Sequence, residues 1–259
     1  MRLEPPARPF THDGATLVWE ERGSGDVTFV LIHGIGMGRS VFGGLGERLS
    51  AHGRAIAIDL PGYGEAPEPP RVPTVERMAD MVAAFLSAHR IEAPVLVGHS
   101  MGAQVAVEVA ARHPALKARP VLIGPTVEIG KRRAFTQLRR LATDLLDESP
   151  KVLLIGAREY VRAGPHLRLK MRAMLTHAPE RAFPRVAEPA LVLRGEKDLV
   201  APHDWCRAVA DALPLGQLRE IPDSGHEAMI RNPDPAADRI VAWLAETGER
   251  GVADADPSA

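Results

Sequence analysis

The chain has a single cysteine, Cys206, among its 259 residues. One cysteine cannot form an internal disulfide, and Cys206 lacks the companion cysteines and histidines of a zinc site. We therefore expect it to be a small apolar residue on a helix. The cysteine content therefore indicates neither a metal site nor a disulfide framework.

Charge of one sign and long apolar runs are also scarce. The 32 Lys and Arg residues nearly balance the 33 Asp and Glu residues, which gives a formal net charge of −1. This balance argues against a nucleic-acid partner or a membrane surface. No stretch reaches the ~20 apolar residues of a membrane span, and the first residues lack the apolar segment of a secretory signal. We expect a cytoplasmic protein; the sequence leaves its oligomeric state open.

What the sequence does contain is a regular alternation of short apolar runs with helical patterns. Runs rich in Val, Ile and Leu and bounded by turn residues are typical of buried strands in a parallel sheet. The predicted strands are Val27–Ile32, Ala55–Ile58, Pro94–Val97, Pro120–Ile123, Ala190–Leu193 and Gln217–Ile221. An earlier segment, Thr16–Arg22, alternates and precedes a Gly-Ser-Gly turn, so we expect an antiparallel leading strand.

Helical patterns separate these runs. They cover Val41–His52, Thr74–Arg90, Met101–Arg112, His203–Leu213 and Asp234–Glu246. Repetition of strand and helix predicts an α/β fold with a doubly wound, mostly parallel sheet.

One interval is too long for a simple crossover between strands. Residues 126–185 show helical patterns interrupted by turns, and we interpret them as a helical insertion in a core formed by residues 1–125 and 186–247. The stretch 127–185 holds 13 Lys and Arg against 6 Asp and Glu. A solvated outer face explains this basic character best, and attraction of anionic substrates is the alternative. Residues 248–259 are expected to form a disordered tail.

A candidate nucleophile lies where a predicted strand runs into a helix. Gly98-His99-Ser100-Met101-Gly102 has the pattern Gly-x-Ser-x-Gly. A reactive serine must be held on a sharp strand-to-helix turn, whose strained backbone tolerates only small residues two positions away. The turn also places the N–H of Met101 at a helix N-terminus, where it can stabilise an oxyanion. Ser100 is therefore the predicted nucleophile.

A serine nucleophile needs a base and an acid that orients the base. His226 follows the last predicted strand, at the sheet edge from which a base must come. Asp198 follows the preceding strand, and the order Ser100, Asp198, His226 suits a catalytic triad. Glu196 and Glu128 are rival acids. Seven other histidines are expected to be solvated: His12, His52, His89, His113, His166, His177 and His203.

The oxyanion hole needs a second donor. The segment His33-Gly34-Ile35-Gly36 ends the first parallel strand, and its small residues allow a ligand to approach the backbone. We expect the N–H of Ile35 to be this donor. Gly34, Gly36 and His99 are further candidate substrate-binding residues.

These segments, together with Asp59-Leu60-Pro61-Gly62-Tyr63-Gly64, resemble the α/β-hydrolase superfamily, in particular its esterase-like members. The resemblance extends from Val27 to Trp243, with the segments in the family's order. It implies the α/β-hydrolase fold, a helical cap formed by the insertion, and serine hydrolase chemistry on a small molecule without a cofactor. Carboxylic esters or thioesters are the expected substrates, cleaved through an acyl-enzyme.

Other functions stay open. The same triad serves carbon–carbon bond hydrolases, lactonases and perhydrolases, and a ligand-sensing receptor could keep it while working by binding. A dinucleotide-binding domain is a further alternative, because Gly34, Gly36 and Gly38 follow one strand and Asp59 ends the next. The spacing departs from Gly-x-Gly-x-x-Gly, however, and that function would leave the serine, the acid and the base unexplained.

Overall fold

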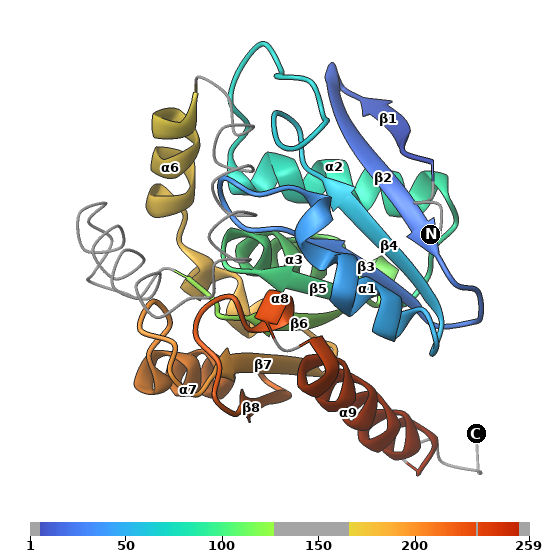
Figure 1. Ribbon diagram of the computed structural model, residues 1–259, viewed down its shortest axis with the longest axis vertical. Coiled ribbons are helices and arrows are strands. Elements are labelled where there is room, and N and C mark those ends of the chain that lie inside the picture. Colours follow the sequence, from blue (N-terminus) through green and yellow to red (C-terminus); the bar gives the residue numbers. More distant parts are fainter. Residues whose placement is uncertain (1–5, 127–165, 232, 254–259) are drawn as a thin grey trace.

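The computed structural model describes residues 6–126, 166–231 and 233–253, and Figure 1 shows their arrangement. Most of the predicted insertion and the rival acid Glu128 therefore lie outside the described residues. Among the described residues, no helix combines the length and apolar character that crossing a membrane requires.

Eight strands form one sheet in the order β1-β2-β4-β3-β5-β6-β7-β8. β2 runs antiparallel to both β1 and β4, and every other neighbouring pair is parallel. The strands are β1 (Arg8–His12), β2 (Ala15–Arg22), β3 (Thr28–Ile32), β4 (Arg54–Asp59), β5 (Val95–His99), β6 (Arg119–Ile123), β7 (Ala190–Gly195) and β8 (Gly216–Ile221). The prediction of a mostly parallel α/β sheet is confirmed.

Helices cover both faces of this sheet (Figure 1). The helices of these two layers are α1 (Gly43–Leu49), α2 (Val75–Ala88), α3 (Met101–Arg112), α7 (His203–Ala212), α8 (Ala228–Arg231) and α9 (Pro233–Ala253), and a further helix, α6 (Leu167–Thr176), belongs to the insertion. The chain enters α1 through a 3₁₀ turn at Arg39–Phe42, and Thr74 caps α2 by accepting a hydrogen bond from the N–H of Arg77.

The side-chain alternation of the central strand β3 explains the two helical layers. Phe29 and Leu31 point into the core beneath α1, α8 and α9, whereas Val30 and Ile32 point into the core beneath α2, α3 and α7. All four side chains are fully buried. Because both faces are covered, the carboxyl edge of the parallel strands and its loops are left to form a site.

Two short elements are absent from the sequence-based expectations. The edge strand β1 carries Pro9 and is largely exposed, so it shows neither alternation nor an apolar run. Its residues pair with β2 in antiparallel register, from Arg8 opposite Trp19 to His12 opposite Ala15. The four-residue helix α8 is too short to produce a helical period.

The described part of the insertion is helical. It contains α6 and two 3₁₀ turns, Pro179–Arg181 and Phe183–Arg185. At the other end of the chain, α9 continues to Ala253, past the predicted start of the disordered tail at residue 248. That start was wrong, because extending an established helix by a turn costs little even through polar residues. Residues 254–259 lie outside the described residues.

Candidate active site

Ser100 occupies a strained turn between β5 and α3. Its backbone φ of 53° and ψ of −112° fall in a region that residues with a side chain rarely adopt. A Cβ atom on Gly98 would lie 2.2 Å from the carbonyl oxygen of Gly102, and one on Gly102 would lie 2.1 Å from that of Ile32. Only glycine fits at these two positions, as the sequence motif predicts.

Asp198 and His226 form a hydrogen-bonded pair on the loops that follow β7 and β8. The Oδ2 atom of Asp198 lies 2.9 Å from Nδ1 of His226, and both side chains are almost fully buried. The other carboxylate oxygen, Oδ1, accepts hydrogen bonds from the N–H groups of Val200 and Ala201, each at 2.8 Å. The acid is therefore fixed through both oxygens, and it holds the imidazole of His226 through Nδ1.

Backbone hydrogen bonds hold the two loops together. The N–H of Lys197, which precedes Asp198, donates to the carbonyl of Ser224 at 2.9 Å. Ser224 lies two residues before His226. Gly124, which follows β6, lies against the pair with φ of 53°. A Cβ atom there would be 2.9 Å from the ring of His226 and 3.0 Å from Oδ2 of Asp198. The ends of β6, β7 and β8 thus meet around the imidazole.

The loop after β3 lies against Ser100. A Cβ atom on Gly34 would be 3.2 Å from Cβ of Ser100, so the loop backbone comes as close to the serine as packing allows. His33 fixes the loop, because its Nδ1–H donates to the carbonyl of Gly34 at 2.8 Å while its Nε2 accepts from the N–H of Leu60 at 3.1 Å. Gly36, with φ of 71°, turns the chain away after Ile35.

The two predicted oxyanion donors flank Ser100. Met101 is the first residue of α3, where N–H groups have no partner within the helix. Ile35 is half-buried in the loop that contacts Ser100 through Gly34. This placement suits backbone stabilisation of a negative oxygen at the serine.

His99 lies beneath this site and is fully buried. Its Nε2–H donates to the backbone carbonyl of His226 at 3.1 Å, and the two rings are 4.8 Å apart. Burial lowers the pKa of His99 well below its ordinary value, and the neighbouring His226 lowers it further. The geometry therefore favours a neutral side chain that holds the loop of His226. Direct contact of His99, Gly34 or Gly36 with substrate stays a prediction.

Comparison with known proteins agrees with this geometry. A family model described as the alpha/beta hydrolase family matches residues 29–239. The chain belongs to the α/β-hydrolase family. It is 28% identical over 227 residues to the pimeloyl-[acyl-carrier protein] methyl ester esterase of Chromobacterium violaceum, a match that covers 78% of this chain and 87% of the relative.

Solved structures show the same fold. A thermophilic esterase from Thermogutta terrifontis superimposes with a TM-score of 0.80 at 23% identity, and the match covers 93% of this chain and 99% of that one. The enol-lactonase from Burkholderia xenovorans gives a TM-score of 0.79 at 23% identity, over 92% and 100% of the two chains. Family and fold together identify the protein as a hydrolase enzyme.

Two alternatives, Glu196 as the orienting acid and a dinucleotide site at Asp59, fit the structure less well. Glu196 is exposed, and its Oε2 accepts a hydrogen bond from the N–H of Asp223 at 3.2 Å, so it is engaged on the outer side of the loop. Asp59, which a dinucleotide would require for its ribose, is buried and accepts hydrogen bonds from the N–H groups of Arg39 at 2.5 Å and Glu65 at 2.9 Å. A dinucleotide site does not fit this arrangement.

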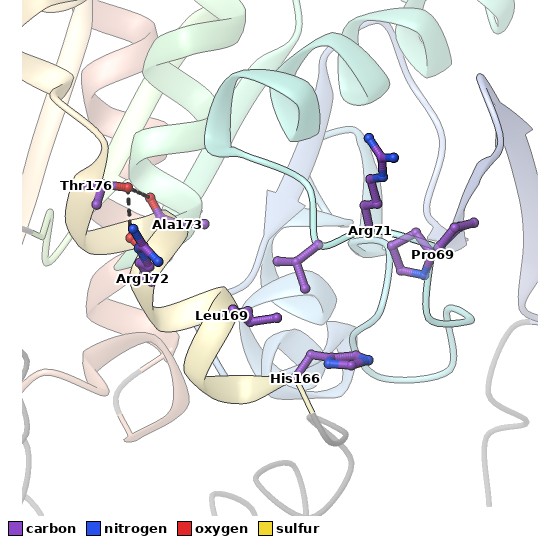
Figure 2. Close-up of a pocket in the computed structure, with 9 residues that line it drawn as sticks. Pro69, Arg71, His166, Leu169, Arg172, Ala173 and Thr176 are labelled. Carbon is purple, nitrogen blue, oxygen red and sulfur yellow. Dashed lines mark hydrogen bonds between the residues drawn. The ribbon is translucent and has the colours of Figure 1, made fainter.

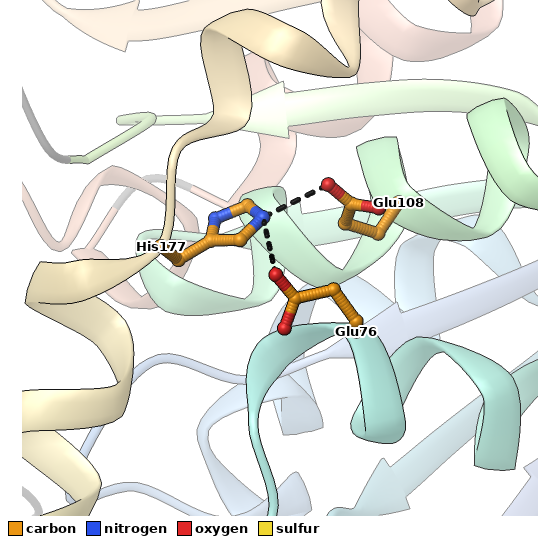
Figure 3. A group of neighbouring side chains, drawn as sticks. All are labelled: Glu76, Glu108 and His177. Atoms are coloured by element: carbon orange, nitrogen blue, oxygen red, sulfur yellow. Dashed lines mark hydrogen bonds and ion pairs between the residues drawn. The ribbon is translucent and has the colours of Figure 1, made fainter.

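A second polar cluster joins α2, α3 and the end of α6. Glu76, Glu108 and His177 each offer one possible metal ligand, and these atoms lie within 4.8 Å of one another (Figure 3). Nε2 of His177 is 2.9 Å from Oε1 of Glu108, however, which is a hydrogen-bond distance. The guanidinium of Arg185 also lies 3.9 Å from the same carboxylate. We interpret the cluster as a hydrogen-bonded tether between α6 and the core.

The prediction that His177 is solvated was wrong, because its side chain is only 1% exposed. The chain leaves α6 at this residue in an extended conformation, with φ of −63° and ψ of 144°, which turns the ring toward α3. Lys170, in the basic insertion, is likewise buried, whereas the sequence favours a solvated basic face. Its fully buried ammonium pairs with Glu68 at 2.8 Å and lies 4.5 Å from the ring centre of Tyr63.

A surface cavity of about 430 Å³ lies between α6 and the loop that precedes α2 (Figure 2). Arg71 and Val72 line one side, and His166, Leu169 and Arg172 line the other. Ser100, Asp198 and His226 are not among the lining residues. The exposed arginines of this cavity agree with a solvated, basic outer face of α6.

Proposed function

We propose that this hydrolase cleaves carboxylic esters or thioesters of small molecules through an acyl-enzyme on Ser100. The observation that carries the proposal is the buried Asp198–His226 pair, with an Nδ1–Oδ2 distance of 2.9 Å, beside a serine on a strained strand-to-helix turn. This combination supplies a nucleophile, a base and a fixed orientation for the base.

The proposed reaction follows from these positions. Oγ of Ser100 attacks the substrate carbonyl carbon while His226 accepts the serine proton at Nε2. The N–H groups of Ile35 and Met101 stabilise the resulting oxyanion. His226 then gives the proton to the departing alcohol or thiol, which leaves an acyl group on Ser100. Water, deprotonated by the same imidazole, hydrolyses this ester and releases the carboxylic acid.

The comparisons support ester cleavage within the family. Similar proteins include one named a methyl ester esterase and solved structures described as an esterase and an enol-lactonase. A lactone is a cyclic ester, so ring opening by the same acyl-enzyme chemistry is the second candidate activity. Carbon–carbon bond cleavage and perhydrolysis are the alternatives to be tested. In each case we propose that the insertion, residues 126–185, covers the site as a cap.

The test is a panel of substrates offered to one enzyme preparation. It comprises p-nitrophenyl esters of increasing acyl length, the matching thioesters, a simple lactone and a vinylogous diketone. We expect hydrolysis of the esters with an initial burst of p-nitrophenol, because acylation precedes release of the acid. Cleavage of the diketone alone would assign the protein to carbon–carbon bond hydrolysis instead.

A further inference from the structure

The hydroxyl of Thr126 points at the nucleophile from the loop after β6. Its Oγ1 lies 3.4 Å from Oγ of Ser100, and the residue is 4% exposed. This residue belongs to no motif in the sequence, because it follows β6 rather than the strand that bears the serine. The loop nevertheless brings it within reach of the reacting atoms.

Buried donors from two helices fix this loop. Nε2 of Gln104, one turn along α3 from Ser100, donates to the carbonyl of Thr126 at 2.9 Å and reaches that of Met174 in α6 at 3.4 Å. Nε1 of Trp205 in α7 donates to the carbonyl of Pro125 at 2.8 Å. Thr126 is therefore held in place by its backbone, and its hydroxyl is not needed for the fold of the loop.

The hydroxyl loses its partner during the reaction. Among the described residues, its one hydrogen-bond partner is Oγ of Ser100, at a distance longer than the 2.7–2.8 Å usual for O–H···O. Once Ser100 carries an acyl group, its oxygen is an ester oxygen and a poor acceptor. A buried hydroxyl left without a partner is unfavourable, so an acceptor on the substrate would be recognised there.

The position of that acceptor follows from the other substituents of the carbon under attack. In the tetrahedral intermediate, one substituent of this carbon is Oγ of Ser100. The second is the oxyanion, which faces the N–H groups of Ile35 and Met101, and the third is the leaving oxygen, which faces His226. The fourth substituent is the acyl chain, and among the described residues Thr126 supplies the side chain that hydrogen-bonds to the serine oxygen without having one of these tasks. At 3.4 Å from that oxygen, its hydroxyl is close enough to reach the first atoms of an acyl chain attached there.

We propose that Thr126 is a substrate-binding residue, and that the preferred substrates carry an oxygen on the carbon next to the scissile carbonyl. The Thr126 hydroxyl donates a hydrogen bond to that oxygen. Substrates of this class include esters of 2-alkoxy and 2-hydroxy acids. The inference rests on the proposed acyl-enzyme chemistry at Ser100 and adds a specificity for the acyl group.

The test compares p-nitrophenyl methoxyacetate with p-nitrophenyl butyrate, which differ by one oxygen in place of one methylene. The quantity measured is the ratio of their kcat/KM values, so the intrinsic reactivity of each ester cancels between variants. Replacing Thr126 by Val keeps the shape but removes the donor, and we expect the ratio to fall by about tenfold, the effect of one hydrogen bond. Thr126→Ser should keep the ratio of the wild type.

Thr126→Ala serves as a second variant without a hydroxyl in case valine does not fold, with thermal unfolding midpoints recorded for all variants. An unchanged ratio in the hydroxyl-free variants would overturn the inference. So would an equal loss on both esters, because that result signifies a structural role. If the wild type hydrolyses neither ester and forms no acyl-enzyme, the proposed function itself has failed, whatever residue 126 is.

Discussion

At the scale of single residues, the account depends on how Asp198 presents His226 to the substrate. The carboxylate accepts three hydrogen bonds, one of them from the imidazole Nδ1–H. An amide in its place would offer a donor to the ring as readily as an acceptor, and so would favour the wrong tautomer. In the proposed mechanism, Asp198 therefore acts through orientation and charge, without passing a proton to the substrate.

Replacing Asp198 by Asn should therefore lower kcat by about three to four orders of magnitude, as the same change does in other triads. Steady-state hydrolysis of a p-nitrophenyl ester measures the loss. Glu196→Gln is the matched control, because Glu196 is exposed and bonded to the N–H of Asp223, and it should cost less than about tenfold. Near-normal activity of the Asp198→Asn protein would show that the acid comes from another strand end, with Glu128 the first residue to test.

The pH dependence of activity should report one group. His226 must be neutral to accept the serine proton, so kcat/KM should fall as the pH is lowered and the imidazole becomes protonated; an isolated histidine titrates around pH ~6.5. His99 adds no second step, because burial and the neighbouring His226 hold its pKa far below that value. A plot of log kcat/KM against pH should have a limiting slope of one, and a flat profile from pH 5 to 8 would exclude a histidine base.

At the scale of elements, α6 is tied to α3, the core helix that begins at Ser100. α3 presents Gln104 and Glu108 one turn apart, the first to the carbonyl of Met174 and the second to the ring of His177. Ser100 lies one further turn back, at the start of the same helix. The helix that begins at Ser100 therefore also holds α6 in position.

Removing the imidazole of this tether should destabilise the protein. In the His177→Ala variant, Glu108 keeps a side chain that is 5% exposed, and Arg185, at 3.9 Å, is its remaining cationic partner within the part of the chain that the structure describes. A lost hydrogen bond to a charged group predicts a decrease of about 1.5–3 kcal/mol in the free energy of unfolding, measured by urea denaturation. Glu76→Gln should cost less, since the Glu76 side chain is 42% exposed. Unchanged stability of the His177→Ala protein would mean that the contact contributes nothing to the fold.

At the scale of the whole molecule, the parallel sheet brings distant parts of the chain to one edge. The proposed nucleophile, acid and base follow β5, β7 and β8, and the loop of Ile35 follows β3. Short apolar runs and the motif around Ser100 are local signals, so the sheet and these residues could be predicted from the sequence. Asp198 and His226 were predicted from their places after the last two strands and from the chain order Ser100, Asp198, His226.

Other features depend on contacts that no local pattern encodes. Thr126 meets Ser100, and His177 meets Glu108, only because separate elements pack together. Burial of Lys170 follows from Glu68 and Tyr63, which lie about a hundred positions away in the chain. β1 was missed because an exposed edge strand with a proline lacks the alternation that marks other strands. Long-range packing of polar residues is therefore the part that the sequence alone left open.

Removal of metal ions should leave the enzyme unaffected. The proposed chemistry uses only side chains and backbone N–H groups, and in the cluster of Glu76, Glu108 and His177 the Nε2 atom of His177 is already engaged by a hydrogen bond to Glu108. Dialysis against EDTA should change neither kcat/KM nor the thermal unfolding midpoint. A loss of either that added Zn²⁺ or Mn²⁺ reverses would reassign that cluster as a metal site.

The most direct measurement of the central claim is covalent labelling of the nucleophile. The full-length protein and its Ser100→Ala variant are incubated with a fluorophosphonate, and intact mass and peptide mapping locate the adduct. Because only a serine activated by His226 reacts rapidly, we predict one adduct per wild-type chain, on Ser100, and none on the variant. The variant should also lose several orders of magnitude in kcat. An adduct on another residue, or undiminished ester hydrolysis by the Ser100→Ala protein, would contradict the account.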